Sequence, residues 1–405
     1  FEVIDKFVLS GTRFRRYTLS ANDTQFTDQV QTSIIELLID DRQNGYIQEY
    51  GDVDTGLAAY FDFRVKGSEG QLLFYPEKFK VNNYDVHGLA YNVDRGGYVN
   101  VGLSSIVGIT SIADIVSISD LGTTINSGVA TAVNIASFDA TAANAAKYLI
   151  VSDQDHLHES VNLNILHDST DVIGVEYGRM NNADLESLAG PGLGTYGATI
   201  SGGVVYLNFT PTSGATGAAV TFNIAETLFQ SGISTLGIGT TQLANGNIVA
   251  GFTTIAASGS PGITTVATWG SLEDGAYAIV EVKDVTNDDW QLSEFVISSN
   301  ANGQVMTEYG VIDTNGSGIG TFAVEYTNDE SHLRFVPIPS VITNVRTLYY
   351  ANKHVGAGTD ILPIGNDDIL NIEGLYSGTE SDIKRAFGLK HGGDQIFTRN
   401  IDASD

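Results

Sequence analysis

Apolar and polar residues alternate in many short runs of this chain, and this pattern predicts β-strands. In Thr321–Tyr326, the side chains of Phe322, Val324 and Tyr326 fall on one side of an extended backbone, as expected for a strand that buries one face. Tyr277–Val282 opens with an aromatic residue and continues with small and β-branched apolar residues, which also favours a strand.

Closely spaced pairs of such runs predict hairpins. Thr195–Ile200 and Val204–Phe209 flank the tripeptide Ser201-Gly202-Gly203. A short glycine-containing loop between two β-rich runs is typical of antiparallel strands. Pro211 follows the second run, and proline suits the end of a strand because it donates no hydrogen bond to the sheet.

The tripeptide Glu-Tyr-Gly occurs three times and indicates an internal repeat. Its tyrosines are Tyr50, Tyr177 and Tyr309, which follow one another at nearly equal intervals. At a similar distance upstream of each, another tyrosine opens a β-like run, at Tyr17, Tyr148 and Tyr277. The shared order of these landmarks predicts three copies of one domain.

A pair of aromatic residues follows each tripeptide at a constant spacing. The interval between the two is the same in every copy, and proline stands two positions after the second, in the sets Phe61/Phe74/Pro76, Tyr196/Phe209/Pro211 and Phe322/Phe335/Pro337. We interpret the repeated tyrosines and phenylalanines as core residues, because large aromatic side chains dominate buried cores. The glycine of each tripeptide is expected to support a turn or bulge.

These signals predict an all-β fold of tandem antiparallel β-sandwich-like repeat domains with minor helix. We expect the first repeat in residues 1–100, linker strands plus the second in 101–232, linker strands plus the third in 233–356, and a C-terminal extension in 357–405. Apolar residues at every third position from Ile106 to Leu121 leave room for a short helix ending at Gly122, and Thr379 resembles a helix cap before Ile383–Phe387. Because the chain starts at Phe1, we expect a processed chain or a piece of a larger protein.

Composition narrows the range of partners. Of the 405 residues, 42% are hydrophobic and only 17% charged, and the net charge is −28. Such a charge disfavours nucleic acid, whose recognition needs clustered Lys and Arg. No apolar run approaches the roughly 20 residues of a membrane span. The chain has no Cys, which excludes disulfides and thiol catalysis.

The densest group of candidate metal ligands is His156-Leu157-His158, with Asp153, Asp155 and His167 nearby. Alternate residues of a strand share a face, so His156 and His158 could bind one divalent metal ion. Gly192–Gly197 matches a dinucleotide-binding pattern, but β-type sequence follows where a helix is required. No nucleophile elbow, zinc-protease helix or phosphate loop is present. The sequence therefore predicts no enzyme, no catalytic residue and no organic cofactor.

Several stretches resemble the large tail-fibre-like virion proteins of contractile-tailed cyanophages. They are Ala146–Ser152 leading to Val175–Gly178, Ala276–Val280 leading to Thr307–Gly310, the stretch from Gly239–Thr241 to Gly259–Gly262, and the segment Gly358–Ile364. The resemblance covers most of the chain after about Ala140. It implies a structural component of a virus particle, located in the virion, that acts in assembly and host attachment.

Two alternatives stay open. The chain could be a surface module that binds or depolymerises host polysaccharide, in which case Trp269 and Trp290, the only tryptophans, would be candidate sugar contacts. It could also be a bacterial surface adhesin of the same domain style. For the virion protein we expect other virion proteins as partners and a homo-oligomer, by analogy with fibres a trimer.

Overall fold

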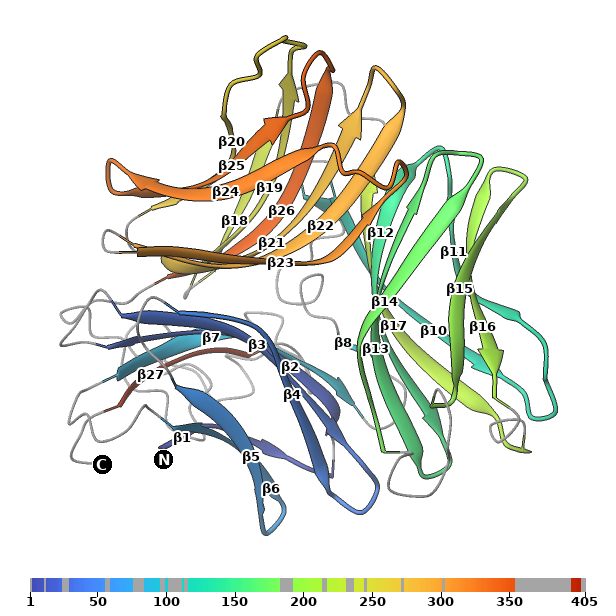
Figure 1. Cartoon of the computed structure of the whole chain (residues 1–405). Coiled ribbons are helices and arrows are strands. Elements are labelled where there is room, and N and C mark those ends of the chain that lie inside the picture. The colour runs from blue at the N-terminus through green and yellow to red at the C-terminus, as the bar shows by residue number, and fades with distance from the viewer. Residues whose placement is uncertain are drawn as a thin grey trace.

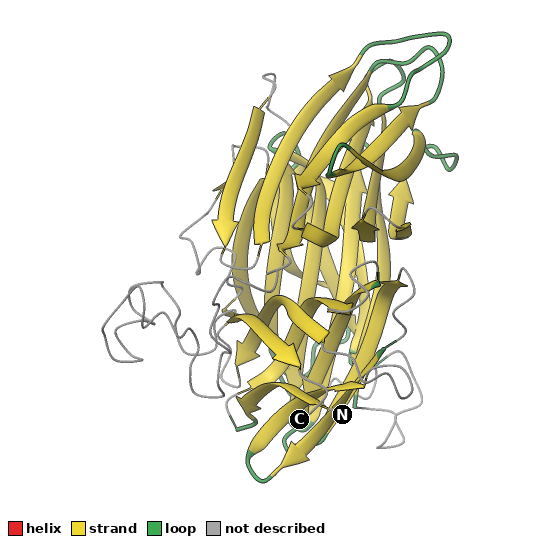
Figure 2. Cartoon of the chain, turned by 90° about the vertical axis from the view of Figure 1, so that its left-hand side faces the viewer, coloured by secondary structure: helices red, strands yellow, loops and turns green. Residues whose placement is uncertain are grey.

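The computed structural model describes residues 2–10, 12–23, 29–54, 59–75, 84–94, 99–100, 111–112, 116–182, 192–212, 217–230, 237–243, 246–270, 273–300, 303–353 and 395–401. These residues form an all-β protein built of antiparallel sheets (Figure 2). None of the described residues forms an α-helix, and this part of the chain therefore contains no helix that could cross a membrane.

Domain 1 pairs a small sheet with a large one. The small sheet has the order β1 (Glu2–Val8), β6 (Glu69–Tyr75), β5 (Tyr60–Lys66). The large sheet has the order β27 (Gln395–Ile401), β7 (Tyr84–Asp94), β2 (Thr12–Asp23), β3 (Val30–Ile39), β4 (Gly45–Asp54), with the short β8 (Val99–Asn100) paired to β7. The C-terminal extension thus contributes a strand to the first domain.

Domain 2 repeats this plan with a six-stranded large sheet. Its order is β14 (Val172–Asn181), β13 (Leu157–His167), β12 (Ala143–Gln154), β17 (Val220–Gln230), β10 (Val116–Ile125), β9 (Ser111–Ile112). The small sheet is β11 (Val133–Asp139), β16 (Val204–Pro211), β15 (Gly194–Ser201).

Domain 3 has the same order of equivalent strands. The large sheet is β23 (Gly303–Asp313), β22 (Asp289–Asn300), β21 (Glu273–Asp284), β26 (Thr343–Lys353), β19 (Gly246–Ile255), β18 (Gly237–Leu243). The small sheet is β20 (Thr264–Gly270), β25 (Glu330–Pro337), β24 (Gly320–Thr327).

The three domains form three lobes around a common centre (Figure 1). Each small sheet lies on the outside of its lobe, and the large sheets face inward toward one another. This arrangement explains why central strands such as β3 and β13 are buried along their whole length. One face of each packs inside its own sandwich, while the other packs against a neighbouring domain.

The constant spacing between the paired aromatic residues is the signature of a hairpin in each small sheet. Phe61 pairs with Phe74, Tyr196 with Phe209, and Phe322 with Phe335, each directly across two strands. Their ring centroids lie 5.5, 5.1 and 4.8 Å apart, respectively. These pairs face the large sheet, and the phenylalanine of β6, β16 and β25 is fully buried in each core.

The upstream tyrosines do not all occupy one structural position. Tyr17 and Tyr148 are fully buried inside the sandwiches of domains 1 and 2. By strand register, Tyr277 is instead equivalent to Arg16 and Lys147, the residues that directly precede Tyr17 and Tyr148. Since neighbouring residues of a strand point to opposite faces, Tyr277 points out of its sandwich toward the other domains.

The linker segment before domain 2 forms strands in the part that the structure describes, as expected, and the short helix that the period of three allowed is not formed there. Residues 116–121 belong to β10, which forms ten consecutive residue pairs with β17 and includes Gly122. The isoleucines and valines of this stretch favour a strand, and the edge of β17 provides a partner that local sequence does not reveal. The helix predicted after Thr379 lies outside the described residues.

Candidate functional site: the polar junction of the three domains

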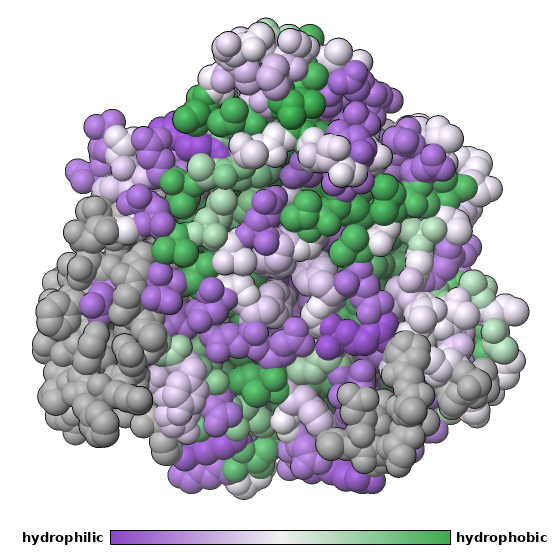
Figure 3. Space-filling model, in the orientation of Figure 1, coloured by the Kyte–Doolittle hydropathy of each residue, from purple (hydrophilic) through white to green (hydrophobic). Residues whose placement is uncertain are grey.

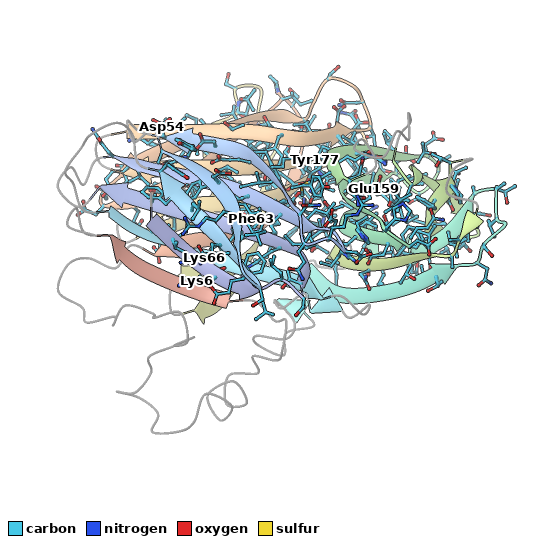
Figure 4. The ribbon with its side chains drawn as sticks, turned by 90° about the horizontal axis from the view of Figure 1, so that it is seen from below. Lys6, Asp54, Phe63, Lys66, Glu159 and Tyr177 are labelled. Carbon is cyan, nitrogen blue, oxygen red and sulfur yellow. The ribbon has the colours of Figure 1, made fainter. Side chains whose placement is uncertain are left out.

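Polar side chains from all three large sheets meet at the centre of the molecule. We call this group the polar junction, and it comprises Arg16, Glu36, Tyr50, Lys147, Asn162, Asn164, Tyr177, Tyr277, Glu294 and Tyr309. Figure 4 labels Tyr177, whose side chain lies where the ribbons of the three domains come together.

The tyrosines of the three Glu-Tyr-Gly tripeptides meet at this centre. The ring of Tyr309 packs edge-on against Tyr50 and Tyr177, with centroids 5.8 Å apart in both pairs. The following glycines, Gly51, Gly178 and Gly310, have φ between +58° and +63°. Each lies at a β-bulge, where the register with the neighbouring strand shifts. The tripeptide therefore combines a tyrosine at the contact between domains with a glycine at a bulge of its strand.

Glu294 of domain 3 accepts hydrogen bonds from side chains of the neighbouring domain. Lys147 Nζ lies 2.7 Å from both carboxylate oxygens of Glu294, and Asn164 Nδ2 lies 2.9 Å from Oε1. The hydroxyls of Tyr177 and Tyr277 also donate to this carboxylate. One carboxylate of domain 3 thereby holds three strands of domain 2.

A second group of polar contacts connects domain 1 to the same centre. Arg16 Nη1 donates to Asn162 Oδ1 at 3.2 Å, and Asn162 Nδ2 donates to Glu36 Oε1 at 3.1 Å. Tyr50 donates to the same Glu36 oxygen at 2.9 Å. The Arg16 guanidinium also lies over the ring of Tyr277 from domain 3, 5.3 Å from its centroid.

The junction balances its charges away from solvent. Its two cations and two anions are at most 6% exposed: Arg16, Lys147, Glu36 and Glu294. Burial alone raises the pKa of the Glu294 carboxyl, but the Lys147 ammonium and the hydroxyl donors hold it below its usual value. Burial lowers the pKa of Lys147 to about 8, against the opposing effect of Glu294. Groups so deeply buried are out of reach of a soluble substrate, and their chemistry serves to fix the domains together.

Hydrophobic clusters surround the junction along each boundary between domains. Domains 1 and 2 share a cluster that includes Phe14, Leu38 and Leu149. Domains 2 and 3 share a larger one containing Phe229 and Trp290, and domains 1 and 3 share Ile34, Val53 and Val296. Apolar burial of this kind supplies most of the free energy of association, while the polar groups between the clusters fix the register.

The histidines predicted as metal ligands lie at the edge of the boundary between domains 1 and 2. His156 is exposed in a turn, whereas His158 is buried at the start of β13. The His158 ring lies between Asp153 (Nδ1 to Oδ1, 2.7 Å) and Asp41 (Nε2 to Oδ2, 3.3 Å). Arg13 contacts the same two carboxylates at 2.9 Å. In the part of the chain that the structure describes, no group of three or more potential ligands has metal-binding geometry, and the metal site stays a prediction.

The repeat pattern predicts the three tripeptide tyrosines as core residues but gives no signal for the charged groups around them. Arg16, Lys147 and Tyr277 are equivalent by register yet differ chemically, as do Ile34, Asn162 and Glu294. A search for residues shared among repeats therefore passes over them. The signal that could have found them was a charged residue within an apolar strand, such as Lys147 between Ala146 and Tyr148.

We expect the buried carboxyl of Glu159 to make folding depend on pH. This fully buried carboxyl lies 2.7 Å from Arg179 Nη1, yet burial raises its pKa to about 7. A carboxyl whose pKa is raised on folding adds stability below pH 4.5, its pKa in the unfolded chain, and loses it as the pH rises through 7. In the native protein, we expect this carboxyl to lower the free energy of unfolding by up to about 3 kcal/mol as the pH rises across this range. The contribution should be absent from Glu159→Gln.

Urea unfolding at a series of pH values measures this effect. The exposed Glu330→Gln is the matched control and should leave the pH dependence unchanged. A residual slope is expected in Glu159→Gln, because burial also raises the pKa of Glu49 to about 7. An unchanged slope in Glu159→Gln would contradict the assignment.

No protein-family model matches this chain, and no curated protein matches its sequence. The fold itself defines the class: a three-domain β-sandwich protein whose repeats are joined about a buried polar junction.

Proposed function

We propose that this chain is a structural component of a virus particle, a bacteriophage tail, fibre or decoration protein that acts in assembly and host attachment. The observation that carries the structural role is the polar junction, because the buried charges of three domains hold those domains in one arrangement. A single chain thereby gains a three-lobed body. The viral setting rests on the sequence resemblance of Ala146–Ser152 and its repeats.

The surface supports a role among neighbouring proteins rather than on nucleic acid. With a net charge of −28, the chain repels phosphate backbones. The face shown in Figure 3 mixes hydrophilic and hydrophobic patches, and the exposed apolar side chains of the molecule include Val8 and Ile263. Protein–protein interfaces have a similar mixture of polar and apolar area, so this surface is compatible with contacts between proteins.

Polysaccharide binding through the tryptophans is the less favoured alternative. Trp269 and Trp290 are only 4% and 3% exposed, respectively. Both pack within domain 3 or at its boundary with domain 2, so neither ring offers a face to a sugar. A glycan site on this protein would need other residues.

Light scattering coupled to gel filtration, with and without EDTA, tests the proposed assembly role. We expect a discrete oligomer whose mass is unchanged by EDTA, because carboxylates already contact both nitrogens of His158. Dissociation in EDTA would instead support a metal at His156 and His158. A monomer in both conditions would contradict self-assembly and favour a surface-binding module.

A further inference from the structure

Each large sheet contains a strand that pairs with the last strand of its domain. This strand is β10 in domain 2 and β19 in domain 3, and in the sequence both precede every other strand of their sandwich except the edge strands β9 and β18. We call them leading strands. Each runs on to the first strand of the small sheet, from β10 to β11 and from β19 to β20. In domains 2 and 3 the chain thus passes from the edge strand of the large sheet through the leading strand to the small sheet.

In domain 1 the corresponding place is filled from the other end of the chain. Strand β27 pairs antiparallel with β7, as β10 pairs with β17 and β19 with β26. The register is the same in all three domains. The final isoleucine of each strand opposes the first residue of its partner strand, in the pairs Ile125/Val220, Ile255/Thr343 and Ile401/Tyr84. By register, β27 is a leading strand, although it follows domain 3.

The connection to β27 is much longer than those to the other leading strands. Residues 354–394 separate β26 from β27, whereas residues 231–245 separate β17 from β19. A connection of this length could span up to about 140 Å when extended, which is far enough to reach another molecule. The edge of β7 that accepts β27 is shared only with the short β8 among the described strands.

We propose that the edge of β7 is a docking site for a second copy of this chain, and that β27 is the strand exchanged between copies. Strand β27 of one copy pairs with β7 of the next, in the register seen within one chain, and continues the series of leading strands head to tail. Exchange of an identical strand conserves every residue pair. Protein concentration and the connecting segment therefore decide whether β27 pairs within its own chain or with the next copy. This inference does not depend on a viral role.

Engineered cysteines can distinguish the two pairings, because the chain contains no cysteine of its own. His87 opposes Thr398, and Ala90 opposes Gln395. Opposite residues alternate between two kinds of antiparallel pair, with Cα atoms about 4.5 or 5.5 Å apart. These two pairs differ in kind, so together they test both spacings, each of which a disulfide tolerates. The experiment mixes His87→Cys protein with size-tagged Thr398→Cys protein, and likewise Ala90→Cys with Gln395→Cys.

The mixtures are incubated at high concentration in about 0.5 M NaCl, where the Debye length of roughly 4 Å screens the charge between copies. After oxidation, we expect mixed covalent dimers at several times the yield of either variant alone, and a ladder of oligomers from the double variant His87→Cys/Thr398→Cys. Closure of the double variant within single chains, without mixed dimers, would overturn exchange. Failure of both pairs to cross-link in any form would also overturn it. Light scattering could show a discrete oligomer while cross-links form only within single chains. That result would rule out strand exchange but would still support the proposed function.

Discussion

Replacing Glu294 by Gln is expected to lower the free energy of unfolding by about 3–5 kcal/mol. The substitution keeps the shape of the side chain but leaves the buried Lys147 ammonium without its partner carboxylate. It also turns an amide donor toward a site where Asn164 and two tyrosine hydroxyls already donate. Both effects leave buried polar groups unsatisfied, which is the costliest outcome for a polar cluster.

Urea unfolding followed in parallel by tryptophan fluorescence and far-ultraviolet circular dichroism measures the effect. Both tryptophans belong to domain 3, so fluorescence reports that domain while dichroism reports the whole chain. We expect the two transitions to coincide in the native protein and to separate in Glu294→Gln, because the junction couples domain 3 to its neighbours. Coincident transitions at an unchanged midpoint would show that the junction does not couple the domains.

A double variant isolates the ion pair. Lys147→Met together with Glu294→Gln removes both charges, so the double variant should lose less stability than the sum of the two single variants. Glu325→Gln is the control for an exposed pair: Glu325 bonds Arg334 at 2.8 Å, but its side chain is 52% exposed. We expect that control to change stability by less than about 1 kcal/mol. Additive losses in the double variant would contradict a direct interaction between Lys147 and Glu294.

Gly310→Ala is expected to destabilise the protein by about 3 kcal/mol, through two separable effects. The positive φ of +58° costs about 1–2 kcal/mol for a residue with a Cβ atom. In addition, the new Cβ would lie 2.8 Å from Asn164 Nδ2 and 3.1 Å from the Tyr177 ring. Asn164 cannot move aside freely, because its amide bonds both Glu294 and the Gly310 carbonyl at 2.9 Å.

Gly202→Ala is the matched control for the backbone effect. Gly202 has φ of +60° in the β15–β16 hairpin, and a Cβ added there would meet nothing within 4 Å. It should therefore show the backbone cost alone, and Gly310→Ala should exceed it by at least about 1 kcal/mol in the same urea titrations. Equal losses for the two variants would mean that close packing between domains does not constrain the tripeptide glycine.

The ion pair and the tripeptide glycine contribute different properties to the same junction. The ion pair fixes which strands of domains 2 and 3 face each other, since a shifted register would bury charges without partners. The tripeptide glycines allow the sheets to approach closely enough for that pairing. At Gly51, for instance, an added Cβ would meet Val296 of domain 3 at 2.5 Å. The junction therefore needs both chemical complementarity and a backbone without side chains at the contact.

Local structure within each repeat could be predicted from the pattern of residues alone. Alternation identified strands such as β24, and the recurring interval between Phe322 and Phe335 reflects a hairpin that places the two rings opposite each other. The tripeptide glycines signalled a turn or bulge, and the backbone has a positive φ and a bulge at each of them. These features depend on residues close in sequence, where strand period and turn geometry leave few choices.

The way the domains meet, and the strand that completes the first of them, emerged only once whole sheets were packed together. Alternation tells which residues share a face of a strand, but not what covers that face, so the meeting of Arg16, Lys147 and Glu294 could not be read from the sequence. Nor could the pairing of β27 with β7, which joins a strand of the first domain to one near the end of the chain. Such contacts form between surfaces far apart in sequence, and the residues that make them differ from one repeat to the next.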